Sequence, residues 1–144
     1  MFVVDTNVLL DAANQDSPHH EPCRGFVENA RRQSLPWYLT WNIVYEFLRV
    51  STHARVFRYP WTPSQAWQFL EALLAAPSAG LLIAGPRHQG VLAQVFSELP
   101  QLRGNVVHDA HTAVLMREHG IHRIITRDTD FYRFPFLTVA SPED

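Results

Sequence analysis

The sequence predicts an α/β domain with a central parallel sheet of four to five strands and helices on both faces. Short apolar runs that suit buried strands alternate with longer segments whose apolar residues recur at helical spacing. Residues 2–4 illustrate the first pattern, and Ile43, Phe47 and Val50 the second. The length of 144 residues fits one domain, and no linker or internal repeat divides it.

The composition is that of a globular protein, with 47% hydrophobic and 18% charged residues. No apolar run approaches the ~20 residues that a membrane-spanning helix needs, and the first residues lack the basic start of a signal peptide. Cys23 is the only cysteine, which excludes an internal disulfide and a cysteine-based zinc cluster. We therefore expect a cytoplasmic protein with no membrane partner.

The charged residues narrow the possible chemistry. A net charge of −2 does not favour a partner held by general electrostatic attraction alone. All 12 basic residues are arginine, because the chain contains no lysine. This excludes Schiff-base chemistry, the lysine of a phosphate-binding loop and the lysine of a receiver domain. Guanidinium groups are the only strong phosphate-binding side chains left.

The first half of the chain reads as two strand–helix units. We expect Thr6 and Asn7 to cap a helix that opens at Val8, and Thr40 or Asn42 to cap the helix after the second strand. The expected elements are a strand over 2–4, a helix from Val8, a loop over 14–18, a helix over about 20–33, a strand over 37–39 and a helix to about Ser51.

The second half opens with a loop over 53–61. Residues 62–65 form a capping box with proline at the first helical position, and we expect Trp67, Leu70 and Leu74 to be buried by the helix that follows. The further elements are the end of that helix near Ala76, a strand over 80–84, helices over about 87–99 and 106–119, a strand over 122–126 and a short strand over 136–139.

Carboxylates follow the strands where a parallel sheet presents its chemistry. Asp5 follows the first strand and Asp128 the fourth, so both can meet at one edge of the sheet. Asp109 lies in the first turn of a helix, where a charge favourable to the helix dipole is, taken alone, the simpler explanation. Glu46 is expected on a core-facing side, which an ion pair with Arg49, a side chain that extends to the surface, or a bound cation would explain.

Three or four carboxylates in one cleft repel one another unless a cation neutralises them. Oxygen-only ligation favours Mg²⁺ or Mn²⁺ over zinc. Such ions can activate water and stabilise the leaving oxygen of a phosphodiester. The pattern therefore predicts a metal-dependent phosphoryl-transfer site. Asp11 and His88 are not expected to belong to this site, and we expect both to be solvated.

Four motifs carry a resemblance to PIN-domain ribonucleases. They occur in the family's order and are Val-Asp-Thr-Asn-Val-Leu-Leu at 4–10, Tyr-Glu-Phe-Leu-Arg at 45–49, Asp-Ala-His at 109–111 and Thr-Arg-Asp-Thr-Asp-Phe at 126–131. The chain looks most like a VapC-type toxin of a bacterial toxin–antitoxin pair. Because the resemblance covers essentially the whole length, we expect residues 1–144 to form one PIN-like domain.

The resemblance implies roles for particular residues. Asp5 and Asp109 are expected to be direct metal ligands, and Glu46 and Asp128 to complete the metal or water shell. The resemblance also assigns a further, variable acidic position and two supporting side chains, and these residues are Asp130, Asn7 and Thr126.

The function implied is an endoribonuclease that uses Mg²⁺ or Mn²⁺ to cleave RNA such as tRNA, rRNA or mRNA and leaves a 3′-hydroxyl. The resemblance further implies a homodimer, a helical clip and a small antitoxin that blocks the acidic cleft. Candidates for holding RNA phosphates are Arg49, Arg55, Arg58 and Arg133.

Two alternatives remain open at the level of the sequence. A structure-specific deoxyribonuclease would share the metal chemistry, and a panel of RNA and DNA substrates separates it from a ribonuclease. A non-catalytic PIN-like scaffold or a receiver domain predicts no metal-dependent cleavage. The intact acidic set argues against the scaffold, and the absence of lysine argues against the receiver.

Overall fold

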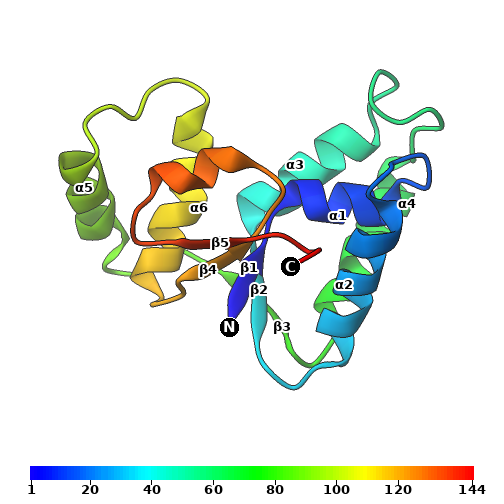
Figure 1. The fold of residues 1–144 in the computed structure, drawn as a ribbon, viewed down its shortest axis with the longest axis horizontal. Helices are drawn as coiled ribbons and strands as arrows, with labels where there is room; N and C mark the ends of the chain where they lie inside the picture. Colours follow the sequence, from blue (N-terminus) through cyan, green and yellow to red (C-terminus); the bar gives the residue numbers. More distant parts are fainter.

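The protein, described over residues 1–144 by a computed structural model, is built on a five-stranded parallel sheet (Figure 1). Its strands are β1 (Phe2–Val4), β2 (Trp37–Thr40), β3 (Ala79–Leu82), β4 (Arg123–Ile125) and β5 (Thr138–Ala140). Its helices are α1 (Thr6–Ala13), α2 (His20–Arg32), α3 (Trp41–Ser51), α4 (Pro63–Leu74), α5 (His88–Glu98), α6 (Val106–Glu118) and the 3₁₀ helix η1 (Thr129–Arg133). The predicted α/β fold class is confirmed.

The strand order β3-β2-β1-β4-β5 makes β1 the central strand. The crossovers that leave β1 and β2 carry α1 to α4 on one side of the sheet, whereas α5, α6 and η1 lie on the other side (Figure 1). The chain after β1 therefore turns to one face and the chain after β4 turns to the other. Open parallel sheets bind their ligands at such a switch point, outside the carboxyl ends of the two strands.

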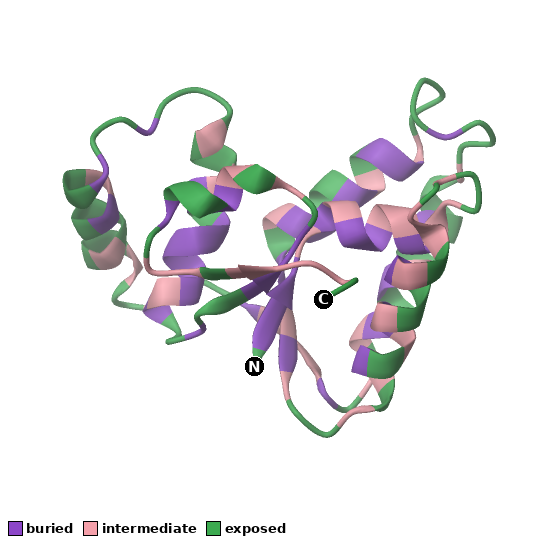
Figure 2. Ribbon diagram, in the orientation of Figure 1, coloured by how far each residue is buried: buried purple, intermediate pink, exposed green.

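The core lies on both faces of the central strands (Figure 2). Val3 and Ile124 are fully buried partners in neighbouring strands, as expected for a parallel sheet that is covered on both faces. On the side of α1 to α4, Phe47 stacks on Phe69 with ring centroids 5.1 Å apart and meets the edge of Trp61 at 6.2 Å. This packing anchors α3, which forms one wall of the site described below.

The first helix begins two residues earlier than predicted. Asp5, rather than Thr6 or Asn7, is its N-cap, and the Asp5 carboxylate accepts a hydrogen bond from the Thr6 N–H. The last strand also begins later than predicted, because the Leu137 N–H still bonds to the carbonyl of Phe134 in a turn. The carboxylate at the end of β1 is thus part of a helix start.

The predicted burial of Trp67 is wrong, since this residue is 38% exposed. The buried stripe of α4 is formed by Ala66, Leu70 and Leu73, at spacings of four and three residues. Trp67 lies one position around the helix from this stripe, and Leu74 is half-buried for the same reason.

His88 is also less solvated than predicted. Its Nδ1 lies 2.9 Å from the carboxylate of Glu118, which is 3% exposed and also accepts a hydrogen bond from the Gly85 N–H. No helix of the chain combines the length and the apolar character that crossing a bilayer requires.

Candidate active site

Asp5 is held by the ends of two neighbouring strands. Its Oδ1 accepts the Thr6 N–H at 2.8 Å, and its Oδ2 accepts the Thr126 hydroxyl at 2.8 Å and the Asn7 side-chain amide at 3.2 Å. The Asp5 N–H in turn donates to the carbonyl of Ile125 in β4. The parallel pairing of β1 with β4 therefore fixes both the backbone and the carboxylate of Asp5.

Thr126 connects the first carboxylate to the next one along the chain. Besides donating to Asp5, its hydroxyl oxygen accepts the Asn7 amide and the Asp128 N–H, both at 3.0 Å. Thr126 is 3% exposed, so water cannot easily replace these hydrogen bonds. Asn7 and Thr126 thus make the contacts expected of supporting residues.

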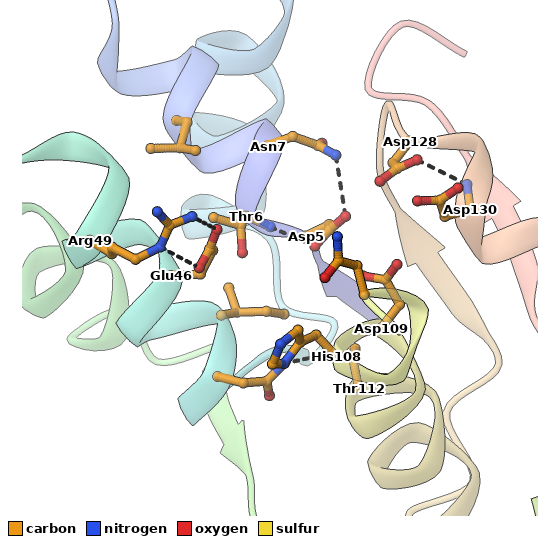
Figure 3. Close-up of a pocket in the computed structure, with 14 residues that line it drawn as sticks. Asp5, Thr6, Asn7, Glu46, Arg49, His108, Asp109, Thr112, Asp128 and Asp130 are labelled. Atoms are coloured by element: carbon orange, nitrogen blue, oxygen red, sulfur yellow. Dashed lines mark hydrogen bonds and ion pairs between the residues drawn. The ribbon is translucent and has the colours of Figure 1, made fainter. Parts of the chain in front are cut away.

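Three carboxylates gather beside Asp5 in Figure 3. One carboxylate oxygen each of Asp109, Asp128 and Asp130 lie within 4.8 Å of one another. Asp109 comes from the first turn of α6, and Asp128 caps η1 by accepting the Asp130 N–H at 2.9 Å. The donor set is oxygen only and carries several negative charges, which fits a hard divalent cation.

Burial and mutual repulsion disturb the ionisation of this group. Loss of solvent and, after it, the charges of Asp5, Asp128 and Asp130 raise the pKa of Asp109 to about 7, and Arg133 opposes this shift. Loss of solvent also raises the pKa of Asp5 to about 6, although the hydrogen bonds from Thr126 and Thr6 favour its charged form. Without a cation, the four carboxylates therefore repel one another when they are ionised.

Glu46 reaches the same cleft but not the same cluster. Arg49, one turn further along α3, holds the Glu46 carboxylate with two hydrogen bonds of 2.6 and 3.1 Å (Figure 3). The ion pair with Arg49 is thus present, and the expectation that Glu46 faces the core is wrong, because its side chain is 46% exposed. The group of three carboxylates contains Asp130 and not Glu46.

These residues line one cleft of ≈ 780 Å³ at the switch point of the sheet. Only two of its 14 lining residues are hydrophobic, which suits a hydrated, charged ligand better than an apolar one. Asn42 donates across the cleft to Thr112 at 2.8 Å and ties α3 to α6. His108 and Thr112 lie on one face of α6 with Asp109, and Asn105 precedes the helix on the same side; this spacing could have identified them from the sequence.

A family model for the PIN domain matches residues 2–137. The chain belongs to the PIN-domain family. Ribonuclease VapC43 of Mycobacterium tuberculosis is 37% identical over 144 residues, which are all of this chain and 97% of the relative.

Solved PIN-domain structures share the fold at low sequence identity. The VapBC2 complex of Rickettsia felis bound to a fragment of its promoter DNA superposes with a TM-score of 0.70 at 17% identity, over 97% of each chain. VapC20 of Mycobacterium tuberculosis, described as a Sarcin-Ricin loop cleaving toxin, gives 0.63 at 16% identity over 92% of this chain and 93% of the other.

The four arginines of this PIN domain that are candidates for holding phosphate fall into two groups. Arg49 lines the cleft, and Arg133 is near enough to lower the pKa of Asp109. Arg55 and Arg58 lie on the exposed loop after α3 and do not line the cleft, and the Arg58 guanidinium lies over the Tyr59 ring at 5.3 Å. Of the four, only Arg49 and Arg133 lie near enough to the carboxylates to contact a ligand that is bound there.

We expect Thr126→Val to damage the site while keeping the side-chain volume. The substitution removes the hydroxyl that joins Asp5, Asn7 and Asp128, so the pKa of Asp5 should rise further and the protein should lose about 1–3 kcal/mol of stability. Titration of Asp5 by NMR and thermal unfolding measure the two effects. Thr126→Ser keeps the hydroxyl and is the control, and an unchanged pKa in the valine variant would contradict this account.

Proposed function

We propose that this PIN domain is a metal-dependent endoribonuclease and the toxin of a toxin–antitoxin pair. The observation that carries the proposal is the cluster of Asp109, Asp128 and Asp130 beside Asp5, in a polar cleft at the switch point of the sheet. Relatives that are 31–37% identical over 96–100% of the chain are named VapC ribonucleases, which supports RNA as the substrate. Such a toxin would act in the cytoplasm.

The carboxylates would hold Mg²⁺ or Mn²⁺, with Asp5, Asp109 and Asp128 as ligands and Asp130 as a further one. The cation would neutralise the cluster, make water a stronger nucleophile and stabilise the leaving oxygen of the phosphodiester. Asp5 is held in place for this role by Thr126 and Asn7. The raised pKa values of Asp5 and Asp109 mean that cation binding must displace protons near neutral pH.

The α3 wall would act on the substrate. Arg49 lines the cleft beside Glu46, and its guanidinium can turn from this carboxylate to a backbone phosphate of RNA. Glu46 would then be free to join the acidic set as the fourth member. Arg133, which is near enough to act on the pKa of Asp109, would hold a further phosphate, whereas Arg55 and Arg58 do not line the cleft and would contact RNA outside it.

The partner would be a small antitoxin that covers the acidic cleft, and the toxin would be a homodimer. Structures with the same fold include VapBC complexes from Rickettsia felis and from nontypeable Haemophilus influenzae, which supports a cognate antitoxin. An arginine of the antitoxin would suit the cleft, because a guanidinium carries a positive charge and enough N–H donors to bond to two carboxylates at once.

The test is cleavage of a mixed RNA by the purified protein, with matched single-stranded and flap DNA as comparison substrates. We expect RNA cleavage with Mg²⁺ or Mn²⁺, none with EDTA, and recovery when the metal is returned. The new ends should carry 3′-hydroxyls, which a polymerase can extend. Cleavage of DNA alone would indicate a deoxyribonuclease, and folded protein that binds metal but cuts neither would indicate a scaffold.

A further inference from the structure

The segment that carries two of the clustered carboxylates is held to α1 by Thr126 and by Arg127, and Arg127 makes two of these contacts. Arg127 lies between β4 and η1, in the stretch 126–128 that is neither strand nor helix. Its N–H donates to Asn7 Oδ1 at 3.1 Å, and its guanidinium forms an ion pair with Asp11. Asn7 and Asp11 are four residues apart, so one face of α1 holds both ends of Arg127.

Asp11 is itself fixed, which makes it a firm anchor. Its other carboxylate oxygen accepts the Ser17 hydroxyl at 2.8 Å, and its backbone carbonyl lies 2.9 Å from His20 Nδ1. The side chains of Asp11 and Arg127 are only 17% and 29% exposed. The expectation that Asp11 is solvated is therefore wrong, and the pair is screened less by solvent and salt than an ordinary surface pair.

We propose that Arg127 is a positioning residue, and that the Asp11–Arg127 pair sets the separation of Asp128 and Asp130 from Asp5 and Asp109. This inference rests on the metal site of the proposed function. Asp128 follows Arg127 directly and caps η1 through the Asp130 N–H, so any movement of Arg127 passes to both carboxylates. Asp109 comes from α6 and would not follow, and Asp5 is held in place by the pairing of β1 with β4.

The pair also keeps a positive charge away from the cation site. Without Asp11, the guanidinium of Arg127 would be free to turn to the carboxylates of Asp128 and Asp130, which form no ion pair of their own. There it would compete with the divalent cation for the same oxygens. Loss of Asp11 should thus weaken cation binding through a displaced loop and through an internal competitor.

The experiment measures Mn²⁺ binding to the full chain by calorimetry, in the absence of RNA and well below the unfolding temperature. We expect Asp11→Asn and Arg127→Ala each to weaken binding about 10-fold, the usual size of effect for residues that orient metal ligands. The double variant lacks both the pair and the competing guanidinium, so it should bind about as weakly as Arg127→Ala, whereas Asp11→Asn alone should bind somewhat more weakly. Arg127→Lys keeps the charge and should recover part of the affinity.

Arg117→Ala is the matched control. It removes an ion pair with Glu98, of 2.5 and 3.1 Å, in which the arginine is 26% exposed, and it lies outside the cleft. A merely structural role for Arg127 predicts that both arginine variants lower the Tm and leave Mn²⁺ binding within twofold of the parent, which would overturn the inference. So would a parent that binds no Mn²⁺.

The outcome for RNA cleavage is read separately. A parent protein that binds Mn²⁺ but cuts no RNA would refute the ribonuclease and still allow the positioning role to be measured. A parent that cuts RNA while the Arg127 variants bind Mn²⁺ normally would refute the positioning role alone.

Discussion

Replacing Asp109 by asparagine is expected to reduce RNA cleavage by about 10²–10³-fold or more, the usual effect of removing one group that stabilises developing charge. The charges of Asp5, Asp128 and Asp130 all raise the pKa of Asp109, so this carboxylate lies where the negative charges of the cluster converge. A cation at this position would be attracted by all four carboxylates. Asparagine keeps the shape and removes the charge. Single-turnover cleavage at saturating Mg²⁺ and Mn²⁺ measures the loss.

The same variant should fold well, which separates lost chemistry from lost structure. With EDTA at pH 8, Asp109→Asn removes repulsion and should raise the Tm by a few degrees, at roughly 2–4 °C for each kcal/mol. Asp16→Asn, on an exposed loop outside the cleft, is the matched control and should change neither quantity. A folded Asp109→Asn variant that cuts RNA within threefold of the parent would refute the assigned site.

The second large effect is expected on the stability of the folded protein when the pH is raised and metal is removed. Asp5 and Asp109 have folded-state pKa values of about 6 and about 7, both above the ordinary value of 3.8. A carboxyl group with a raised folded-state pKa favours folding while it is protonated, and this contribution is lost as the pH rises through the folded-state pKa. In EDTA, ionisation of these two groups should therefore lower the free energy of unfolding as the pH is raised from 5 to 8.

Mn²⁺ should reverse this trend, because it binds the ionised carboxylates. At 100 times its dissociation constant, a cation adds about 2.7 kcal/mol, or roughly 5–10 °C in Tm, and the gain should shrink at pH 5, where protons compete. Thermal unfolding from pH 5 to pH 8.5, with Mn²⁺ and with EDTA, measures both trends. Asp109→Asn isolates the contribution of the cluster, and an equal gain in Tm at pH 5 and pH 8 would contradict the account.

Local patterns predicted most of the elements. The apolar runs and capping residues placed all five strands and six α-helices in order, with ends that differ by a few residues. The errors arose where one position on a helix decides burial. Trp67 lies beside the buried stripe of Ala66, Leu70 and Leu73 rather than within it, and a short apolar-rich helix allows more than one stripe.

The predictions about charged residues were less complete. The sequence predicted that carboxylates after β1 and β4 could meet, because parallel strands end at one edge of a sheet. It treated Asp11 and His88 as solvated, but their partners Arg127 and Glu118 lie 116 and 30 positions further along the chain. Local periodicity in a sequence cannot reveal ion pairs between residues that are so far apart along the chain.

By itself, the sequence determined the alternation of strands and helices, and with it the shared edge at which Asp5 and Asp128 lie. It also determined a chain without lysine, in which arginine alone can bind phosphate strongly. The tertiary structure alone decided that Asp130 joins Asp109 and Asp128, and that Glu46 stays with Arg49. These choices depend on how α3, α6 and η1 pack around the end of β1, because side chains pair by distance in space.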